Sequence, residues 1–128
     1  MSHRSRLAGF IIDSQQGSLA EAADFWGQAL GLKVRDYDEE GLGLYAVLDG
    51  APGALHVEVQ KVQHPSRVHL DIETDDIEAE VLRLEKLGAR RVEWVRNSWW
   101  VMEAPTGHRF CVVRMNQPEK GEAPTVWT

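Results

Sequence analysis

Residues 55–62 alternate apolar and polar side chains, and three of the polar ones could do chemistry. They are His56, Glu58 and Gln60, which supply an imidazole, a carboxylate and an amide. Successive side chains of a strand point to opposite faces, so these three groups share one face. An imidazole and a carboxylate can hold a divalent cation, whereas the amide of Gln60 is a poor ligand. A half-exposed strand whose polar face meets water shows the same alternation, and both interpretations remain open.

His69 lies in a second alternating segment, residues 67–74. Its neighbours Val68 and Leu70 are apolar, so the imidazole belongs to the polar face of that segment. A divalent cation that acts as a Lewis acid needs about three ligands and an open position for the substrate. If the two polar faces meet, a mixed site of His69 with Glu58 and Gln60 is chemically possible. The alternative is a histidine that is hydrogen-bonded in a cavity or core.

Cys111 is the single cysteine, which excludes an intramolecular disulfide. It lies between Phe110 and Val112 and is interpreted as a small buried hydrophobe, with a thiolate ligand or nucleophile as the alternative. Arg67 and Arg109 begin two of the predicted strands. Either could bind a carboxylate or phosphate of a ligand, or could be a solvated residue at a strand edge.

Three of the five tryptophans, Trp94, Trp99 and Trp100, lie close together in the sequence. Flat aromatic walls suit a planar or apolar ligand. Because Trp99 and Trp100 are adjacent in a strand, we expect one to face inward and the other outward. They are candidate ligand-binding residues, and an exposed one could equally serve a dimer contact.

Composition narrows the class of partner. The formal net charge is −6, and basic residues are interleaved with acids, which argues against nucleic acid or an anionic membrane. The first apolar run is too short for a signal peptide core or a membrane span, so we expect a cytoplasmic protein. No glycine-rich phosphate loop or other catalytic signature is present, and the sequence identifies no catalytic residue.

The elements that must position these residues occur twice. Residues 6–13 predict a buried strand, and Ser18 with Glu21 predicts a capping box for a helix that ends at Gly31. Residues 67–74 predict the second strand, and Asp75 with Glu78 predicts the cap of a second helix. The same spacing separates Ser18 from Gly31 and Asp75 from Gly88, which indicates an internal repeat.

Three strand-sized segments follow each predicted helix, so the order is βαβββ twice and the fold class is α+β. We expect a single domain over residues 1–128, with modules at about 6–62 and 67–115 and a flexible tail over 116–128. His3 is expected in a frayed, exposed terminus. His64 is expected at the surface, and His108 in a turn.

A tandem βαβββ repeat that contains FWGQALGLKV, RVHLDIETDD and APTGHRFCVV resembles the glyoxalase/bleomycin-resistance/dioxygenase superfamily, also called the vicinal oxygen chelate superfamily. The resemblance implies a curled eight-stranded mixed sheet around a central cleft, with the helices outside, and a homodimer. Family members that use a metal take one ligand from the first and one from the last strand of each module. Those positions here are Gly9, Gln60 or Glu58, His69 and Cys111, and Gly9 has no side-chain ligand.

Two functions follow from the resemblance and the residues. The first is a small-molecule-binding protein that takes an aromatic or apolar ligand in the cleft, without an intact metal site and without a cofactor. The alternative is a divalent-metal-dependent lyase, isomerase or dioxygenase that uses His69 with Glu58, Gln60 or His56.

Overall fold

The computed structural model describes residues 2–37 and 43–128, without the side chains of Asp36 and Tyr37. Contacts divide the chain into two compact units: a first unit of residues 9–68 and a second unit of residues 1–8 with 69–128. Each unit is described by itself. Strand β1 (His3–Ser14) begins in the second unit and continues in the first.

The first unit follows the predicted order of one helix and three strands after β1. These elements are α1 (Leu19–Leu30), β2 (Lys33–Tyr37), β3 (Tyr45–Asp49) and β4 (His56–Lys61), with a short 3-10 turn at Pro52–Ala54. The strand order is β2-β3-β4-β1, in which β4 pairs with β1 in parallel and the other pairs are antiparallel. The capping box of Ser18 and Glu21 is present, and Gly31 ends the helix with a φ of 71°.

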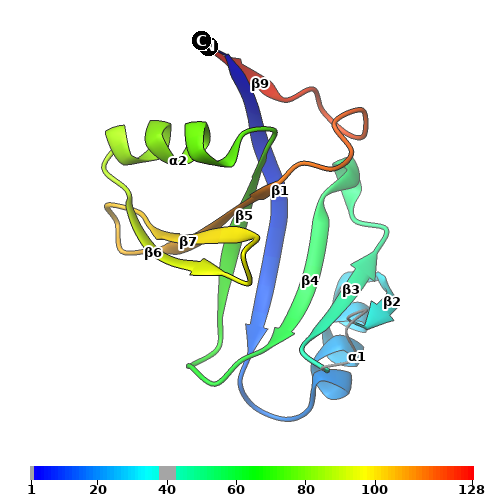
Figure 1. Ribbon diagram of the computed structural model, residues 1–128. Coiled ribbons are helices and arrows are strands. Elements are labelled where there is room, and N and C mark those ends of the chain that lie inside the picture. Colours follow the sequence, from blue (N-terminus) through cyan, green and yellow to red (C-terminus); the bar gives the residue numbers. More distant parts are fainter. Residues whose placement is uncertain (1, 38–42) are drawn as a thin grey trace. The chain divides into compact units, whose positions relative to one another are not determined.

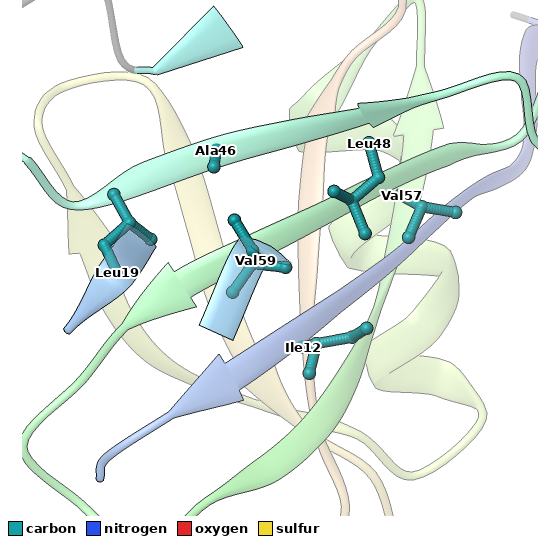
Figure 2. Close-up of a cluster of buried hydrophobic side chains, with 7 residues drawn as sticks. Ile12, Leu19, Ala46, Leu48, Val57 and Val59 are labelled. Atoms are coloured by element: carbon teal, nitrogen blue, oxygen red, sulfur yellow. The ribbon is translucent and has the colours of Figure 1, made fainter. Parts of the chain in front are cut away.

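A buried apolar cluster holds α1 against this sheet. Figure 2 shows Leu19 of α1 with side chains of β1, β3 and β4. The labelled residues are Ile12, Leu19, Ala46, Leu48, Val57 and Val59. Every second residue of β4 enters the cluster, which leaves His56, Glu58 and Gln60 on the other face of the sheet, as the alternation predicts.

The second unit repeats the pattern. Its elements are β5 (Arg67–Thr74), α2 (Ile77–Lys86), β6 (Arg90–Val95), β7 (Trp99–Glu103) and β8 (Arg109–Arg114), with the order β5-β8-β7-β6. The first two residues of β5 belong to the first unit. Strand β8 pairs with β5 in parallel, and the other pairs are antiparallel. Val81 and Leu84 of α2 pack on Met102, Phe110 and Val112. The sheet is therefore mixed, and the α+β class with two βαβββ modules is confirmed.

Helix α2 begins one residue later than predicted. Its N-cap is Asp76, whose side chain accepts a hydrogen bond from the amide of Ala79 at 3.0 Å. The carboxylate of Asp75 instead accepts from the backbone amide of Arg4 at 2.8 Å and from its Nε at 2.9 Å. Because Asp75 binds Arg4, the next residue, Asp76, caps the helix instead. Sequence spacing carries no information about such a long-range partner.

The prediction of an exposed, frayed His3 is wrong. His3 is buried and its Nε2 lies 2.8 Å from Oε1 of the fully buried Glu80 on α2. The end of the tail forms a further strand, β9 (Thr125–Trp127), antiparallel to the start of β1 (Figure 1). The guanidinium of Arg6 also donates to the carbonyl groups of Gln117 and Glu122. These contacts in the tail were not predicted from the sequence.

Within the described residues, neither helix is long and apolar enough to cross a membrane.

Candidate functional site

Three potential metal ligands converge on one face of the second unit. His69 and Asp71 are successive polar residues of β5, and Cys111 of β8 lies beside Asp71 in the register. Their ligand atoms all lie within 4.8 Å of one another. The side chains of His69 and Asp71 are 14% and 15% exposed, and Cys111 is buried. The strand periodicity that selected His69 also marked Asp71, but the sequence did not show that Asp71 would neighbour Cys111.

The three side chains of this cluster suit a metal ion that accepts nitrogen, oxygen and sulfur ligands, or a polar ligand. It offers an imidazole nitrogen, a carboxylate oxygen and a thiol sulfur, the ligand types that zinc accepts. The Nε2 of His69 lies 3.6 Å from Oδ1 of Asp71, which is longer than an ordinary hydrogen bond. Both atoms belong to the group of three ligand atoms that lie within 4.8 Å of one another.

The pair of strands beside this cluster carries an aromatic and two ion-paired residues. The register places Val101 beside Cys111 and Glu103 beside Arg109, so Trp99 shares the face of the cluster. The Nε of Arg109 donates to Glu103 at 3.3 Å, and Arg90 donates to the same carboxylate at 3.0 Å. The hydrogen bond from Arg90 holds the pKa of Glu103 below its usual value. A ligand carboxylate would compete with Glu103 for Arg109.

Trp100 faces the other way, as the alternation of a strand requires. It packs on the apolar cluster beneath α2 and not on the face of His69. The structure therefore separates the two adjacent tryptophans, both predicted as ligand-binding residues, onto opposite faces of the sheet.

The first unit carries its own polar face. His56 and Glu58 of β4 are joined by a hydrogen bond of 3.1 Å between Nε2 and Oε1. Gln60 is next on this face, and the register places Gly9, Ile11 and the buried Asp13 of β1 beside the three β4 residues. The predicted metal set of His69, Glu58 and Gln60 takes residues from both units and stays a prediction.

Gly9 stands at the position where the resemblance implies a metal ligand, and the structure explains why it has no side chain. A β-carbon at Gly9 would lie 1.8 Å from the carbonyl oxygen of His56 on the neighbouring strand. This distance is far below contact between unbonded atoms, and the obstacle is backbone. No amino acid other than glycine fits at this position unless β4 moves.

The two remaining histidines lie where expected. His64 interacts with the carbonyl oxygen of Pro65 through Nδ1 at 2.9 Å, in the loop after β4. His108 interacts with the hydroxyl of Thr106 at 2.7 Å in the turn between β7 and β8. Both contacts are local and belong to turns.

A family model described as Glyoxalase-like domain matches residues 10–113, which include both helices and strands β2 to β7. The chain belongs to this glyoxalase-like family. Its fold is that of the glyoxalase/bleomycin resistance/dioxygenase superfamily. No curated protein sequence matches it significantly.

Solved structures agree with the fold of this glyoxalase-like protein. A hypothetical protein from Bacillus halodurans C-125 is similar with a TM-score of 0.66 and 16% identity, over 92% of this chain and 98% of that chain. A methylmalonyl-CoA epimerase from Streptomyces coelicolor, in complex with 2-nitronate-propionyl-CoA, is similar with a TM-score of 0.61 and 16% identity, over 91% and 97%. A glyoxalase/bleomycin resistance protein/dioxygenase superfamily member from Vibrio splendidus 12B01 has a TM-score of 0.56 and 16% identity, over 87% and 99%.

Proposed function

We propose that this glyoxalase-like protein binds a small aromatic or apolar molecule at the face that carries His69, without the four-ligand metal centre of metal-using relatives. The observation that carries the proposal is Gly9. Its place beside the backbone of His56 excludes a side-chain ligand at one of the four positions. A protein without a ligand at this position keeps a polar, partly buried face but has fewer than the four metal ligands that the resemblance implies.

The residues of the second unit support the binding part of the proposal. His69 and Asp71 offer a hydrogen-bond donor and acceptors in a half-buried setting, and Trp99 shares their face. Pockets for small molecules combine apolar and aromatic walls with a few polar groups in this manner. The fold is also one in which the Streptomyces coelicolor epimerase holds a CoA ester.

The experiment is a titration of the whole chain with small aromatic carboxylic acids, such as indole acetate and naphthoate, followed by amide and indole shifts in NMR spectra. We expect shifts at His69 and Trp99, and a roughly tenfold weaker affinity in His69→Ala, because one hydrogen bond to a ligand contributes about 1 kcal/mol or more. His64→Ala is the matched control and should bind as the native protein does. Equal affinity in His69→Ala and the native chain would refute the assignment.

A divalent-metal-dependent lyase, isomerase or dioxygenase is the second candidate, and the cluster of His69, Asp71 and Cys111 favours it. Three protein ligands with one open position are typical of catalytic zinc sites. A metal bound there would supply a Lewis acid for a carbonyl or enolate oxygen. The imidazole of His69, the carboxylate of Asp71 and the thiolate of Cys111 would hold the metal.

Cobalt substitution separates the two candidates. A Co²⁺ ion bound to the thiolate of Cys111 would give an intense charge-transfer absorption that disappears in Cys111→Ser, whereas Cys111→Ser should keep the fold. Stoichiometric metal in the purified protein, together with this band, would favour the enzyme. Absence of the absorption band at millimolar Co²⁺ would favour the small-molecule-binding protein over the enzyme.

A further inference from the structure

A hollow lies on the side of the sheet that faces α2, within the second unit. Its volume is about 610 Å³, and its lining combines the segment from Asp75 to Glu78 at the start of α2 with Trp94, Trp100 and Arg114. Trp100 lies beside Val112 in the register, and Val112 belongs to the apolar cluster beneath α2. The hollow is therefore on the opposite face from His69, Asp71 and Cys111.

Two tryptophan rings form one wall of the hollow. The ring centroids of Trp94 and Trp100 are 5.4 Å apart, and their planes are tilted by 46°. Trp94 is 41% exposed, and its indole Nε1 donates to Asn97 at 3.1 Å. The polar end of this exposed ring is thus already satisfied, and its π face remains for a ligand.

The same wall already interacts with a cation of its own chain. The guanidinium of Arg91 lies 5.1 Å from the ring centroid of Trp100, within the range of a cation–π interaction. Glu78 and Glu85 hold Arg91 there through hydrogen bonds of 2.7 Å and 3.2 Å. Trp94 offers the equivalent surface without a cation of the chain above it, among the described residues.

Among the described residues, the lining of the hollow has one negative and one positive side chain that form no ion pair. Asp75 is paired with Arg4 at 2.9 Å, and Glu78 is paired with Arg91 at 2.7 Å, so both carboxylates are neutralised by the chain itself. Asp76 caps the amide of Ala79 and forms no ion pair with a described residue. Arg114 likewise has no ion-pair partner in the part of the chain that the structure describes. A complementary ligand therefore carries both a positive and a negative group.

We propose that this hollow binds a small zwitterion with a methylated ammonium group and a carboxylate. The ammonium group lies against Trp94, in the hollow that Asp76 also lines, because an indole ring attracts a cation whose water shell is weak. The carboxylate lies on Arg114, whose planar fork can donate two parallel hydrogen bonds. The site is independent of the face of His69 and of the function proposed for it.

The test is an NMR titration of the whole chain with glycine betaine and γ-butyrobetaine, observed at the indole signals. Choline lacks the carboxylate, and tert-butylacetate replaces the ammonium group by a neutral isostere. We expect at least one betaine to shift the Trp94 indole signal at millimolar concentration. Choline and tert-butylacetate should each bind roughly three- to thirtyfold more weakly, the range that loss of one cation–π or charged contact implies.

Variants locate the site. Trp94→Ala and Arg114→Gln should each lower the affinity for the betaine by a similar factor. In Arg114→Gln the betaine should no longer bind more tightly than choline. Trp99→Ala is the matched control, because Trp99 lies on the other face of the same strand as Trp100, and it should leave the affinity unchanged. Trp94→Phe keeps an aromatic ring, so its affinity for the betaine should lie between those of the native chain and Trp94→Ala. Such an intermediate affinity would show that the loss in Trp94→Ala does not result from misfolding.

Three outcomes would overturn the proposal. One is the absence of indole shifts with either betaine at tens of millimolar. Another is equal binding of a betaine and its neutral or carboxylate-free analogue. The third is a loss of affinity in Trp99→Ala as large as that in Trp94→Ala.

Discussion

Gly9 shows how the close pairing of two strands limits the choice of side chain at one position. The family resemblance implies a metal ligand at this position, yet a β-carbon there would meet the backbone of His56. Only backbone movement could relieve such a contact, since no side-chain rotation displaces a carbonyl oxygen. The pairing of β1 with β4 therefore requires glycine at this position unless β4 moves.

The substitution Gly9→Ala tests that steric argument. We expect a loss of stability of about 3 kcal/mol or more, at the upper end of overpacking effects because the strand itself must shift. Gly107→Ala is the control: Gly107 has a φ of 88° but no atom near its absent β-carbon, so it should lose only about 1 kcal/mol from backbone strain. Urea unfolding of both variants measures the difference. Similar losses in the two variants would contradict the steric explanation.

Glu80 is a second residue whose surroundings determine its behaviour. Burial on α2 raises its pKa, but hydrogen bonds from Arg83, His3 and Ser5 outweigh burial and hold the pKa below the usual 4.5. A carboxyl group whose pKa is lower in the folded state stabilises the protein above the unfolded pKa. That contribution is lost as the pH falls through the folded value, so stability should decline below about pH 4.5.

Glu80→Gln should remove part of this acid sensitivity. At neutral pH the variant should lose about 3 kcal/mol, because Arg83 and His3 keep their places around a group that no longer carries charge. Asp49→Asn is the control, since the ion pair of Asp49 with Arg35 is exposed and should contribute less than about 1 kcal/mol. Urea unfolding between about pH 3 and pH 7 provides the measurement. A native-like pH dependence in Glu80→Gln would contradict the assignment.

At the scale of elements, the start of β1, the end of the tail and α2 form one structural group. Strand β9 pairs with β1, the indole of Trp127 donates to Ser5 at 2.8 Å, and the guanidinium of Arg83 lies 3.8 Å from the Trp127 ring centroid. Arg83 in turn donates to Glu80, which bonds His3. Each end of the chain is thus attached to the same helix.

Trp127→Ala should detach β9. The variant loses a hydrogen bond, a cation–π contact and aromatic packing, which together amount to about 2 kcal/mol. Hydrogen exchange should accelerate at the amides of β1 near Ser5 and leave β4 unaffected. Lys120→Ala, at an exposed position of the same tail, should change neither quantity. Unchanged protection of β1 in Trp127→Ala would show that β9 does not hold this strand.

At the scale of the whole molecule, duplication supplies each module with one helix and four strands, and we expect two copies of the chain to associate. Large apolar side chains lie exposed on the described surface, among them Phe25 at 61% and Leu87 at 66%. Burial of such residues between copies would stabilise a dimer. Light scattering after size-exclusion chromatography should give a mass of about twice 14.4 kDa. A monomer at high micromolar concentration would contradict this expectation.

The sequence by itself determined the two modules, the caps of helix α1 at Ser18 and Gly31, and the strand faces that carry His56, Glu58 and His69. These features depend on neighbours a few residues apart, so periodicity and capping rules reveal them. The tertiary structure alone decided the burial of His3, the transfer of the α2 cap to Asp76, the pairing of β9 and the meeting of Asp71 with Cys111. Each of those depends on residues far apart in the chain, whose register against one another no local pattern encodes.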